Sequence, residues 1–186
     1  MDTIELMEPQ IEYADEIWQF RQEIIDCDAD KEDRFAGCFL LDTSASAEEW
    51  IDQCRHRKSE NTCGAAEGMV PSHTYMGVRK SDNKVIGIID LRHHINHPVL
   101  GSWGGHCGYS VRPSERGKGY AKEMLRLNII NAKLLGIQEL LITCDAANLP
   151  SEKTIVACGG VFEKTVAVDG RMIKRYWIAV TEKEVF

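Results

Sequence analysis

Residues 109–121 read YSVRPSERGKGYA, and this stretch decides the fold. A short apolar run leads into a basic turn with two glycines, and a long segment with helical periodicity follows. The first N–H groups of a helix lack backbone acceptors and carry partial positive charge, so glycines beside them let an anion come close. The stretch therefore predicts a phosphate-binding junction between a strand and a helix.

Two common phosphate-binding loops do not match this stretch. A P-loop, G-x-x-x-x-G-K-[ST], needs a glycine where Arg112 stands and a serine or threonine where Gly119 stands. A dinucleotide-binding loop, G-x-G-x-x-G/A, needs a small residue where Lys122 stands. The pattern that does match is [R/Q]-x-x-G-x-[G/A], with Arg116, Gly119 and Ala121 at its defined positions.

This pattern resembles the coenzyme A pyrophosphate loop of the GNAT N-acetyltransferase superfamily. The resemblance extends over residues 70–180 to a bacterial subgroup of predicted acetyltransferases that is recognised by three motifs. They are R-H-x-x-N at 92–96, G-G-H-x-G-Y-x-V-R-P-S-x-R-G-K-G-Y-A at 104–121, and N-x-x-S-x-x-x-I-x-x-x-G-G at 148–160. The resemblance implies an acyltransferase that carries an acetyl group from its cosubstrate, acetyl-CoA, to an amine.

The hydrophobic pattern predicts the order strand, two helices, three strands, helix, strand, helix and two strands. The strands are expected at 2–8, 73–80, 84–93, 104–111, 139–144, 161–168 and 171–180. The helices are expected at 11–27, from Ser46 onward, at 117–135, and from a cap at Asn148 or Ser151 to Gly159-Gly160. This order matches the GNAT fold. It predicts an α/β (α+β) protein with a mixed central sheet of about six to seven strands, helices on both faces, and a single domain over 1–186.

The charge of the chain is unevenly distributed. The formal net charge is −7, with 17 acidic and 6 basic residues in 1–60 but 12 acidic and 16 basic residues in 61–186. An acidic total speaks against nucleic acid as a partner. The basic part favours an anionic cosubstrate, and the acidic part favours a cationic acceptor unless its charges are simply solvated.

Several features of the sequence indicate a cytoplasmic location. The start, MDTIELMEPQ, lacks the pattern of a secretory signal, and no apolar run approaches the length of a membrane span, so no membrane partner is expected. The seven cysteines include no C-x-x-C pair, which predicts reduced thiols. No cysteine or carboxylate completes a ligand set with His93, His94 and His97, so no metal site is predicted.

The resemblance assigns binding of acetyl-CoA to three segments. The strand before the loop would flank the pantetheine arm, the loop would hold the pyrophosphate through its N–H groups, and the last motif would contact the pantetheine. The residues are Tyr109, Ser110, Val111, Arg116, Gly117, Lys118, Gly119, Tyr120, Ala121, Asn148 and Ser151. Arg116 and Lys118 would lie near phosphate oxygens, whereas Arg112 and Lys122 are interpreted as solvated charges.

The reaction needs a neutral amine, a donor for the developing oxyanion and a way for the thiolate to leave. A backbone N–H near Ser110 or Val111 would stabilise the oxyanion, a contribution of about 3–4 kcal/mol in other enzymes. His106 is the first candidate base, because strand alternation places it on the same face as Ser110. A purely structural histidine is an equally good interpretation, and Asp90, His93 or a chain of waters are other routes.

The thiolate step departs from the common GNAT pattern N-x-x-A-x-x-x-Y. Ile155 stands where that pattern has the tyrosine that protonates the thiolate. A thiolate leaves fairly well unaided, so the difference affects the mechanism more than the activity. Two alternatives stay open: a noncatalytic acetyl-CoA sensor of the same fold, and a transferase that uses another acyl-CoA. A nucleotide-hydrolysing P-loop protein is a distant third.

The acceptor is expected to be a small primary amine, selected by residues 10–70 and 93–103. Arg92, His93 and Asn96 would shape its pocket or brace the nearby loop. The exposed edges of an incomplete sheet favour a homodimer as a further hypothesis.

Overall fold

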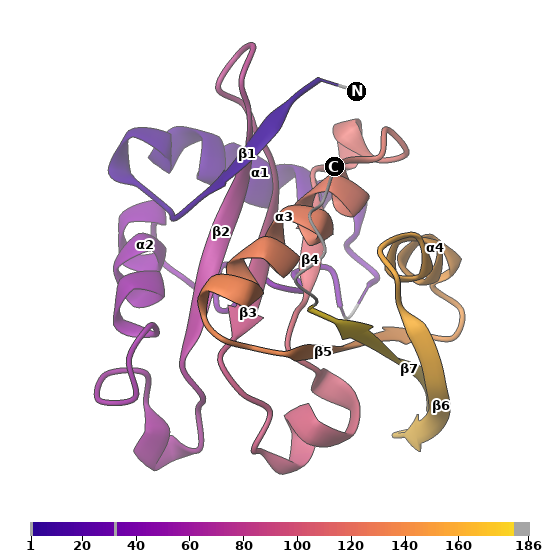
Figure 1. Cartoon of the computed structure of the whole chain (residues 1–186). Helices are drawn as coiled ribbons and strands as arrows, with labels where there is room; N and C mark the ends of the chain where they lie inside the picture. The colour runs from indigo at the N-terminus through magenta and orange to yellow at the C-terminus, as the bar shows by residue number, and fades with distance from the viewer. Residues whose placement is uncertain (1, 32, 181–186) are drawn as a thin grey trace.

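The computed structural model describes residues 2–31 and 33–180, arranged as in Figure 1. In this part of the chain, seven strands and four α-helices follow one another in the predicted order. The strands are β1 Ile4–Met7, β2 Ser72–Arg79, β3 Val85–Arg92, β4 Tyr109–Val111, β5 Glu139–Asp145, β6 Val161–Val168 and β7 Arg171–Ala179. The helices are α1 Ala14–Cys27, α2 Ala47–His56, α3 Tyr120–Leu134 and α4 Leu149–Ala157.

The described strands form two sheets. The first has the order β1-β2-β3-β4 and the second β5-β7-β6, and every hydrogen-bonded pair of strands is antiparallel. The predicted α/β class and the number of strands are confirmed. The difference from one continuous sheet is the break between β4 and β5, which positions the site described below.

Helices cover both faces of the first sheet, as Figure 1 shows. On one face, Ile17 of α1 and Trp50 of α2 pack into a cluster that includes Ile88 of β3. On the other face, Leu125 of α3 packs into a cluster that includes Ile89. Since successive residues of a strand point to opposite faces, adjacent isoleucines of β3 serve two separate cores.

Local sequence signals explain where several elements begin and turn. Ser46 caps α2, because its hydroxyl accepts the Glu49 N–H at 3.3 Å while the Glu49 carboxylate accepts the Ala45 N–H at 2.7 Å. Asp169 and Gly170 join β6 to β7 with φ values of 46° and 79°, the left-handed pair that a tight two-residue hairpin turn requires.

The strand predicted over 104–111 is regular only at Tyr109–Val111. Gly105 has a φ of 68°, and the Gly108 N–H donates to the Asp90 carboxylate at 2.6 Å instead of to the backbone of β3. A carboxylate from the neighbouring strand therefore replaces one ladder bond and shortens β4.

The acidic first third of the chain and its basic remainder are partners of each other. Several carboxylates of residues 1–60 form ion pairs with arginines that lie far along the sequence. The pairs are Glu16 and Glu23 with Arg112, Asp28 with Arg116, and Asp33 with Arg171. Part of the negative charge that suggested a cationic acceptor is therefore neutralised within the protein.

Candidate active site

The two sheets touch at His106 and separate beyond it. The His106 N–H donates to the Leu141 carbonyl at 2.8 Å, and the Leu141 N–H donates to His106 Nδ1 at 2.9 Å. On its other side, the His106 carbonyl accepts the Arg92 N–H at 2.8 Å. Further along, β4 pairs with β3 and no other described strand, so its second edge is open. An extended arm of a substrate can bind along such an edge.

Backbone hydrogen bonds show which groups of β4 face the opening. The Gly108 carbonyl accepts a bond from β3 at 3.1 Å, and the Arg112 N–H donates to β3 at 2.8 Å. Residues at even positions therefore bond towards β3, and the N–H groups of Tyr109 and Val111 point away from it. Either of these two can donate to an oxyanion, whereas the Ser110 N–H faces β3.

The start of α3 offers unbonded N–H groups. Gly117 and Gly119 have φ values of 74° and 89°, and the helix begins at Tyr120, three residues later than predicted. Within 2–31 and 33–180, the N–H groups of residues 117–119 have no acceptor, and the first N–H groups of a helix have none within it. A side chain at Gly117 would meet nothing within 4 Å, so the space before the turn is open. The turn fits a diphosphate.

Arg116 and Lys118, the two basic residues of this turn, form ion pairs with carboxylates. Arg116 binds Asp28 with both terminal nitrogens, one at 3.0 Å, and its Nε donates to the Val111 carbonyl at 3.0 Å. The Arg116 guanidinium lowers the pKa of Asp28, which is buried. Lys118 donates to Glu115 at 2.9 Å. Asp28 therefore anchors the loop, a role for which the sequence carries no local signal.

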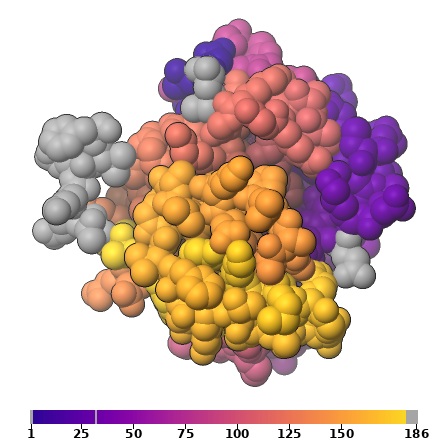
Figure 2. Space-filling model, turned by 90° about the vertical axis from the view of Figure 1, so that its right-hand side faces the viewer, coloured from indigo at the N-terminus to yellow at the C-terminus, as the bar shows by residue number. Residues whose placement is uncertain are grey.

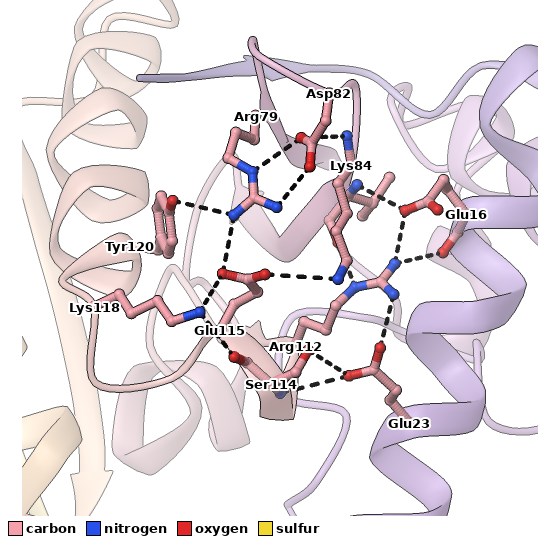
Figure 3. Close-up of polar contacts among 11 residues, drawn as sticks. Glu16, Glu23, Arg79, Asp82, Lys84, Arg112, Ser114, Glu115, Lys118 and Tyr120 are labelled. Carbon is pink, nitrogen blue, oxygen red and sulfur yellow. Dashed lines mark hydrogen bonds and ion pairs between the residues drawn. The ribbon is translucent and has the colours of Figure 1, made fainter. Parts of the chain in front are cut away.

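The interpretation of Arg112 as a solvated charge is wrong. Its side chain is 1% exposed and lies against α1, as Figure 3 shows. Arg112 Nε donates to the Val85 carbonyl at 2.7 Å, Nη1 to Glu23 at 2.9 Å and Nη2 to Glu16 at 2.8 Å. Because its partners lie on distant segments, the residues around Arg112 in the sequence give no indication of its burial.

A second group of charges in Figure 3 surrounds Glu115, which is buried. Its carboxylate lies 3.0 Å from Arg79, 3.6 Å from Lys84 and 2.9 Å from Lys118. Burial opposes ionisation of Glu115, but Lys118 and Arg79 outweigh it, so the pKa of the carboxyl group is lowered. The turn before α3 is thereby fixed to the hairpin of β2 and β3.

The beginning of α4 lies across the opening from β4. Asn148 Oδ1 accepts the Ser151 N–H at 3.1 Å and caps the helix. The Tyr109 hydroxyl is 2.8 Å from Ser151 Oγ, so this phenol connects the first sheet to the helix that follows β5. Burial raises the pKa of Tyr109 well above its ordinary value. Ile155 is buried and offers no hydroxyl, and two phenols bond to this part of α4: Tyr109 to Ser151, and Tyr176 of β7 to the Glu152 carboxylate at 2.6 Å.

The two candidate catalytic residues are buried and hydrogen-bonded. Burial lowers the pKa of His106 to about 4, and because Nδ1 accepts the Leu141 N–H, the neutral ring carries its proton on Nε2. Ser110 Oγ donates to the Ala36 carbonyl at 2.8 Å and fixes the segment after α1 to β4. Both residues lie beside the opening, and their chemical roles stay predictions.

Figure 2 shows this side of the molecule. The orange atoms of α4 stand at its centre, with the salmon atoms around the start of α3 above them and the purple atoms of the segment after α1 to one side. A recess lies where the three groups meet. The segments that carry the predicted binding residues therefore face one another.

Comparison with known proteins agrees with this geometry. A family model described as "Acetyltransferase (GNAT) domain" matches residues 5–161. The chain belongs to the GNAT acetyltransferase family. The protein is therefore an acyltransferase, and its cosubstrate is acetyl-CoA, as the resemblance implied. The search of curated proteins found no match.

Solved structures share the fold at low sequence identity. A GnaT-family acetyltransferase from Bordetella pertussis has a TM-score of 0.65 and 15% identity, covering 96% of this chain and 97% of that chain. An N-acetyltransferase from Staphylococcus aureus has a TM-score of 0.64 and 16% identity, covering 96% and 99%. MccE, a microcin C7 self-immunity acetyltransferase solved with acetyl-CoA and AMP, has a TM-score of 0.62 and 17% identity, covering 96% and 93%. These likenesses confirm the GNAT fold.

Two further observations concern the described residues alone. None of their helices is long and apolar enough to cross a membrane. Within 2–31 and 33–180, no three or more His, Cys, Asp and Glu side chains gather in a way that could hold a metal ion.

Proposed function

We propose that the protein transfers the acetyl group of acetyl-CoA to the primary amine of a small acceptor. The observation that carries the proposal is the combination of an open β4 edge, at Tyr109 and Val111, with unbonded N–H groups at the start of α3. The first suits the pantetheine arm and the second suits the diphosphate. Asn148 and Ser151, which lie across the opening, are proposed to contact the pantetheine.

An amine is supported as the acceptor by two structural neighbours. One is titled spermidine N-acetyltransferase, from Vibrio cholerae, and the other ribosomal L7/L12 alpha-N-protein acetyltransferase. A small acceptor is supported by the close packing of the segment after α1 on β4. A Cβ on Gly37 would lie 2.2 Å from the Gly108 carbonyl oxygen, so this side of β4 has little room for a second polypeptide.

Acetyl-CoA supplies an acetyl thioester, and the residues of the chain supply position and protons. The N–H groups of Tyr109 and Val111 are proposed as oxyanion donors because both face the opening. Tyr109 holds its proton on Oη at neutral pH, since burial raises its pKa, and it is proposed as the proton donor in place of Ile155. His106 remains the proposed base; because its unprotonated nitrogen, Nδ1, accepts the Leu141 N–H, it takes the amine proton there only when that bond opens. Ser110 positions the covering segment.

Calorimetric titration with acetyl-CoA tests the binding half of the proposal. Ala121 lies in the first turn of α3, so the carboxylate of Ala121→Glu opposes a diphosphate, while Ala121→Gln adds similar bulk without charge. We expect the affinity for acetyl-CoA to fall about 100-fold or more in Ala121→Glu and less in Ala121→Gln. Each tenfold change in affinity corresponds to about 1.4 kcal/mol of binding free energy. Ala66→Glu, on an exposed turn, should bind as the wild type does.

Equal binding by all four proteins would refute the loop as the diphosphate site, and no binding by the wild type would refute the cosubstrate. Release of coenzyme A thiol over a panel of primary amines then tests transfer. Tight binding of acetyl-CoA without turnover of any amine would favour a noncatalytic acetyl-CoA sensor. Faster turnover with a longer acyl-CoA than with acetyl-CoA would favour a transferase that uses another acyl-CoA.

Three broader properties are also proposals. A single domain over 1–186 is supported by a family match over residues 5–161, which runs through the first sheet and reaches β5 of the second. A cytoplasmic location is supported by the seven cysteines, all of which are unpaired. A homodimer is supported by the exposed edge strand β6, which carries exposed Val161 and Phe162, and light scattering tests it.

A further inference from the structure

The face of the first sheet beneath α2 changes from apolar to polar along its length. Its apolar part packs under α1 and α2, and the polar rows follow towards the ends of β2 and β3. Each row consists of three cross-strand neighbours, one from β2, one from β3 and one from residues 106–110. From the apolar to the polar end, the rows are Met76–Ile88–Ser110, Thr74–Asp90–Gly108 and Ser72–Arg92–His106. The last row ends where the two sheets touch. A buried polar floor therefore runs from α2 to the inner end of the proposed active site.

The guanidinium of Arg57, the residue after α2, lies over this floor and has no hydrogen-bond partner among the described residues. Its side chain is 9% exposed, and Nε and Nη1 are buried and unbonded to any residue of 2–31 and 33–180. The described contact of the guanidinium is the ring of Phe39, 3.6 Å from Cζ. The Arg57 carbonyl accepts the Ser72 N–H at 2.8 Å, and Ser72 Oγ is likewise buried and unbonded.

The neighbouring charges satisfy one another. Arg92 Nη2 lies 3.0 Å from Asp90, and Arg92 Nη1 donates to the Gly104 and Gly105 carbonyls at 3.1 and 3.0 Å. The second partner of Asp90 is the Gly108 N–H, at 2.6 Å. Burial lowers the pKa of Arg57, and the charge of Asp90 opposes this only in part. Arg57 is therefore one uncompensated cation on the floor.

An unpartnered guanidinium in this position indicates the chemistry of a missing ligand. Buried polar groups are nearly always bonded, and a buried charge without a partner is costly, so an exception needs a reason. Guanidinium is a donor and never an acceptor, and its planar fork matches a carboxylate. One uncompensated positive charge is neutralised by a ligand with one negative charge. A carboxylate carries one such charge, whereas a phosphate dianion carries two.

We propose that Arg57 and Ser72 bind a carboxylate of the acceptor, so that the substrate is a small molecule with both an amine and a carboxylate. This inference rests on the proposed acetyl transfer. The strand spacing of about 4.8 Å places the main chain of Arg57 three steps, or about 14 Å, from that of His106. The side chain of Arg57 can span part of this distance, and the remainder compares with the length of a compact amino acid.

The test compares matched acceptors with matched variants. Each common amino acid and its amide are offered with acetyl-CoA to the wild type, Arg57→Met and Arg55→Met, which removes an exposed arginine from the end of α2. We expect the wild type and Arg55→Met to favour the best carboxylate over its amide by about tenfold or more in kcat/KM, the usual weight of a hydrogen bond to a charged group. Arg57→Met should lose this preference while its affinity for acetyl-CoA is unchanged.

A second measurement does not depend on turnover. Acetate and acetamide are added at equal ionic strength, and the midpoint of thermal unfolding is followed. A ligand that binds the folded state raises this midpoint. Acetate should stabilise the wild type and Arg55→Met more than acetamide does, and it should give Arg57→Met no such advantage.

The two measurements separate the two proposals. If acetyl-CoA does not bind, acetyl transfer is wrong, and acetate stabilisation that depends on Arg57 still shows the anion site. If acetyl-CoA binds but the wild type uses acids and amides equally well and acetate has no effect on the unfolding midpoint, the carboxylate site is wrong. A loss of preference in Arg55→Met equal to that in Arg57→Met would also overturn the inference.

Discussion

Replacement by methionine should destabilise the protein at one buried arginine and not at the other. Arg112 and Arg57 are 1% and 9% exposed, and methionine at either position keeps an unbranched apolar stem while it removes the charge. Arg112 donates to two carboxylates and to backbone carbonyls, whereas the side chain of Arg57 has no hydrogen-bond partner among the described residues. Comparing Arg112→Met with Arg57→Met therefore isolates what the partners contribute.

The loss in Arg112→Met follows from its four hydrogen bonds. The carboxylates of Glu16 and Glu23 are 30% and 33% exposed and can regain water, but the Val85 carbonyl, in a fully buried residue, cannot. Removing one partner of a buried ion pair costs about 3–5 kcal/mol. Because the acids are partly hydrated already, we expect the free energy of unfolding to fall by about 3 kcal/mol.

Arg57→Met should be neutral or stabilising. It removes two desolvated N–H groups that have no acceptor, each unfavourable by about 1–3 kcal/mol, and it gives up a cation–π contact with Phe39 worth about 0.5–2 kcal/mol. The balance of these figures lies between no change and a stabilisation of about 5 kcal/mol.

Urea denaturation at pH 7, followed by tryptophan fluorescence and circular dichroism, measures both changes. The slope m should stay constant, so that shifts in the midpoint report stability. If Arg57→Met destabilised the protein as much as Arg112→Met does, Arg57 would have a structural partner, and the reasoning from its unbonded nitrogens would be refuted.

Other predictions address the chemistry and its pH dependence. Tyr109→Phe should lower kcat by about 10–100-fold with acetyl-CoA affinity intact, as measured by thiol release; an unchanged kcat would remove Tyr109 as the acid. His106→Gln should slow transfer by no more than about 100-fold, because an imidazole with a pKa of about 4 is a weak base. His106 is neutral when folded and protonates near 6.5 when unfolded, so stability should fall as the pH drops from about 6.5 to about 4, and urea midpoints at pH 7 and pH 5 should differ less in His106→Gln than in the wild type. Asp28 has a lowered folded pKa, so its contribution is present above the ordinary value of 3.8 and is lost as pH falls through the folded value; Asp28→Asn should be less stable at neutral pH and less sensitive to acid below pH 4.

Elements with a local cause could be predicted from the sequence. α2 begins at a serine with a glutamate three residues later, and the β6–β7 turn contains Asp169-Gly170, so neighbours in the chain determine both. The turn before α3 could be predicted for the same reason, since Gly117 and Gly119 adopt the left-handed conformations that glycine allows.

The features that could not be predicted from the sequence depend on contacts between residues that are distant in the chain. β4 is shorter than predicted because an Asp90 oxygen, 18 residues away, takes the Gly108 N–H. Arg112 is buried, not solvated as predicted, because it binds Glu23 and Glu16, which lie 89 and 96 residues away in the sequence. Arg57 and Arg112 look alike in sequence, and what separates them is which acids the fold brings near, a property that periodicity and spacing do not encode.

The long-range ion pairs also bear on how the chain is made. Residues 1–60 leave the ribosome with a net charge of −11, and Arg112, Arg116 and Arg171, which neutralise Glu16, Glu23, Asp28 and Asp33, are synthesised later. Until then the charges of the acidic segment repel one another without these partners. A nascent chain halted near residue 105 should therefore be open to protease, and one that extends past β7 should be protected.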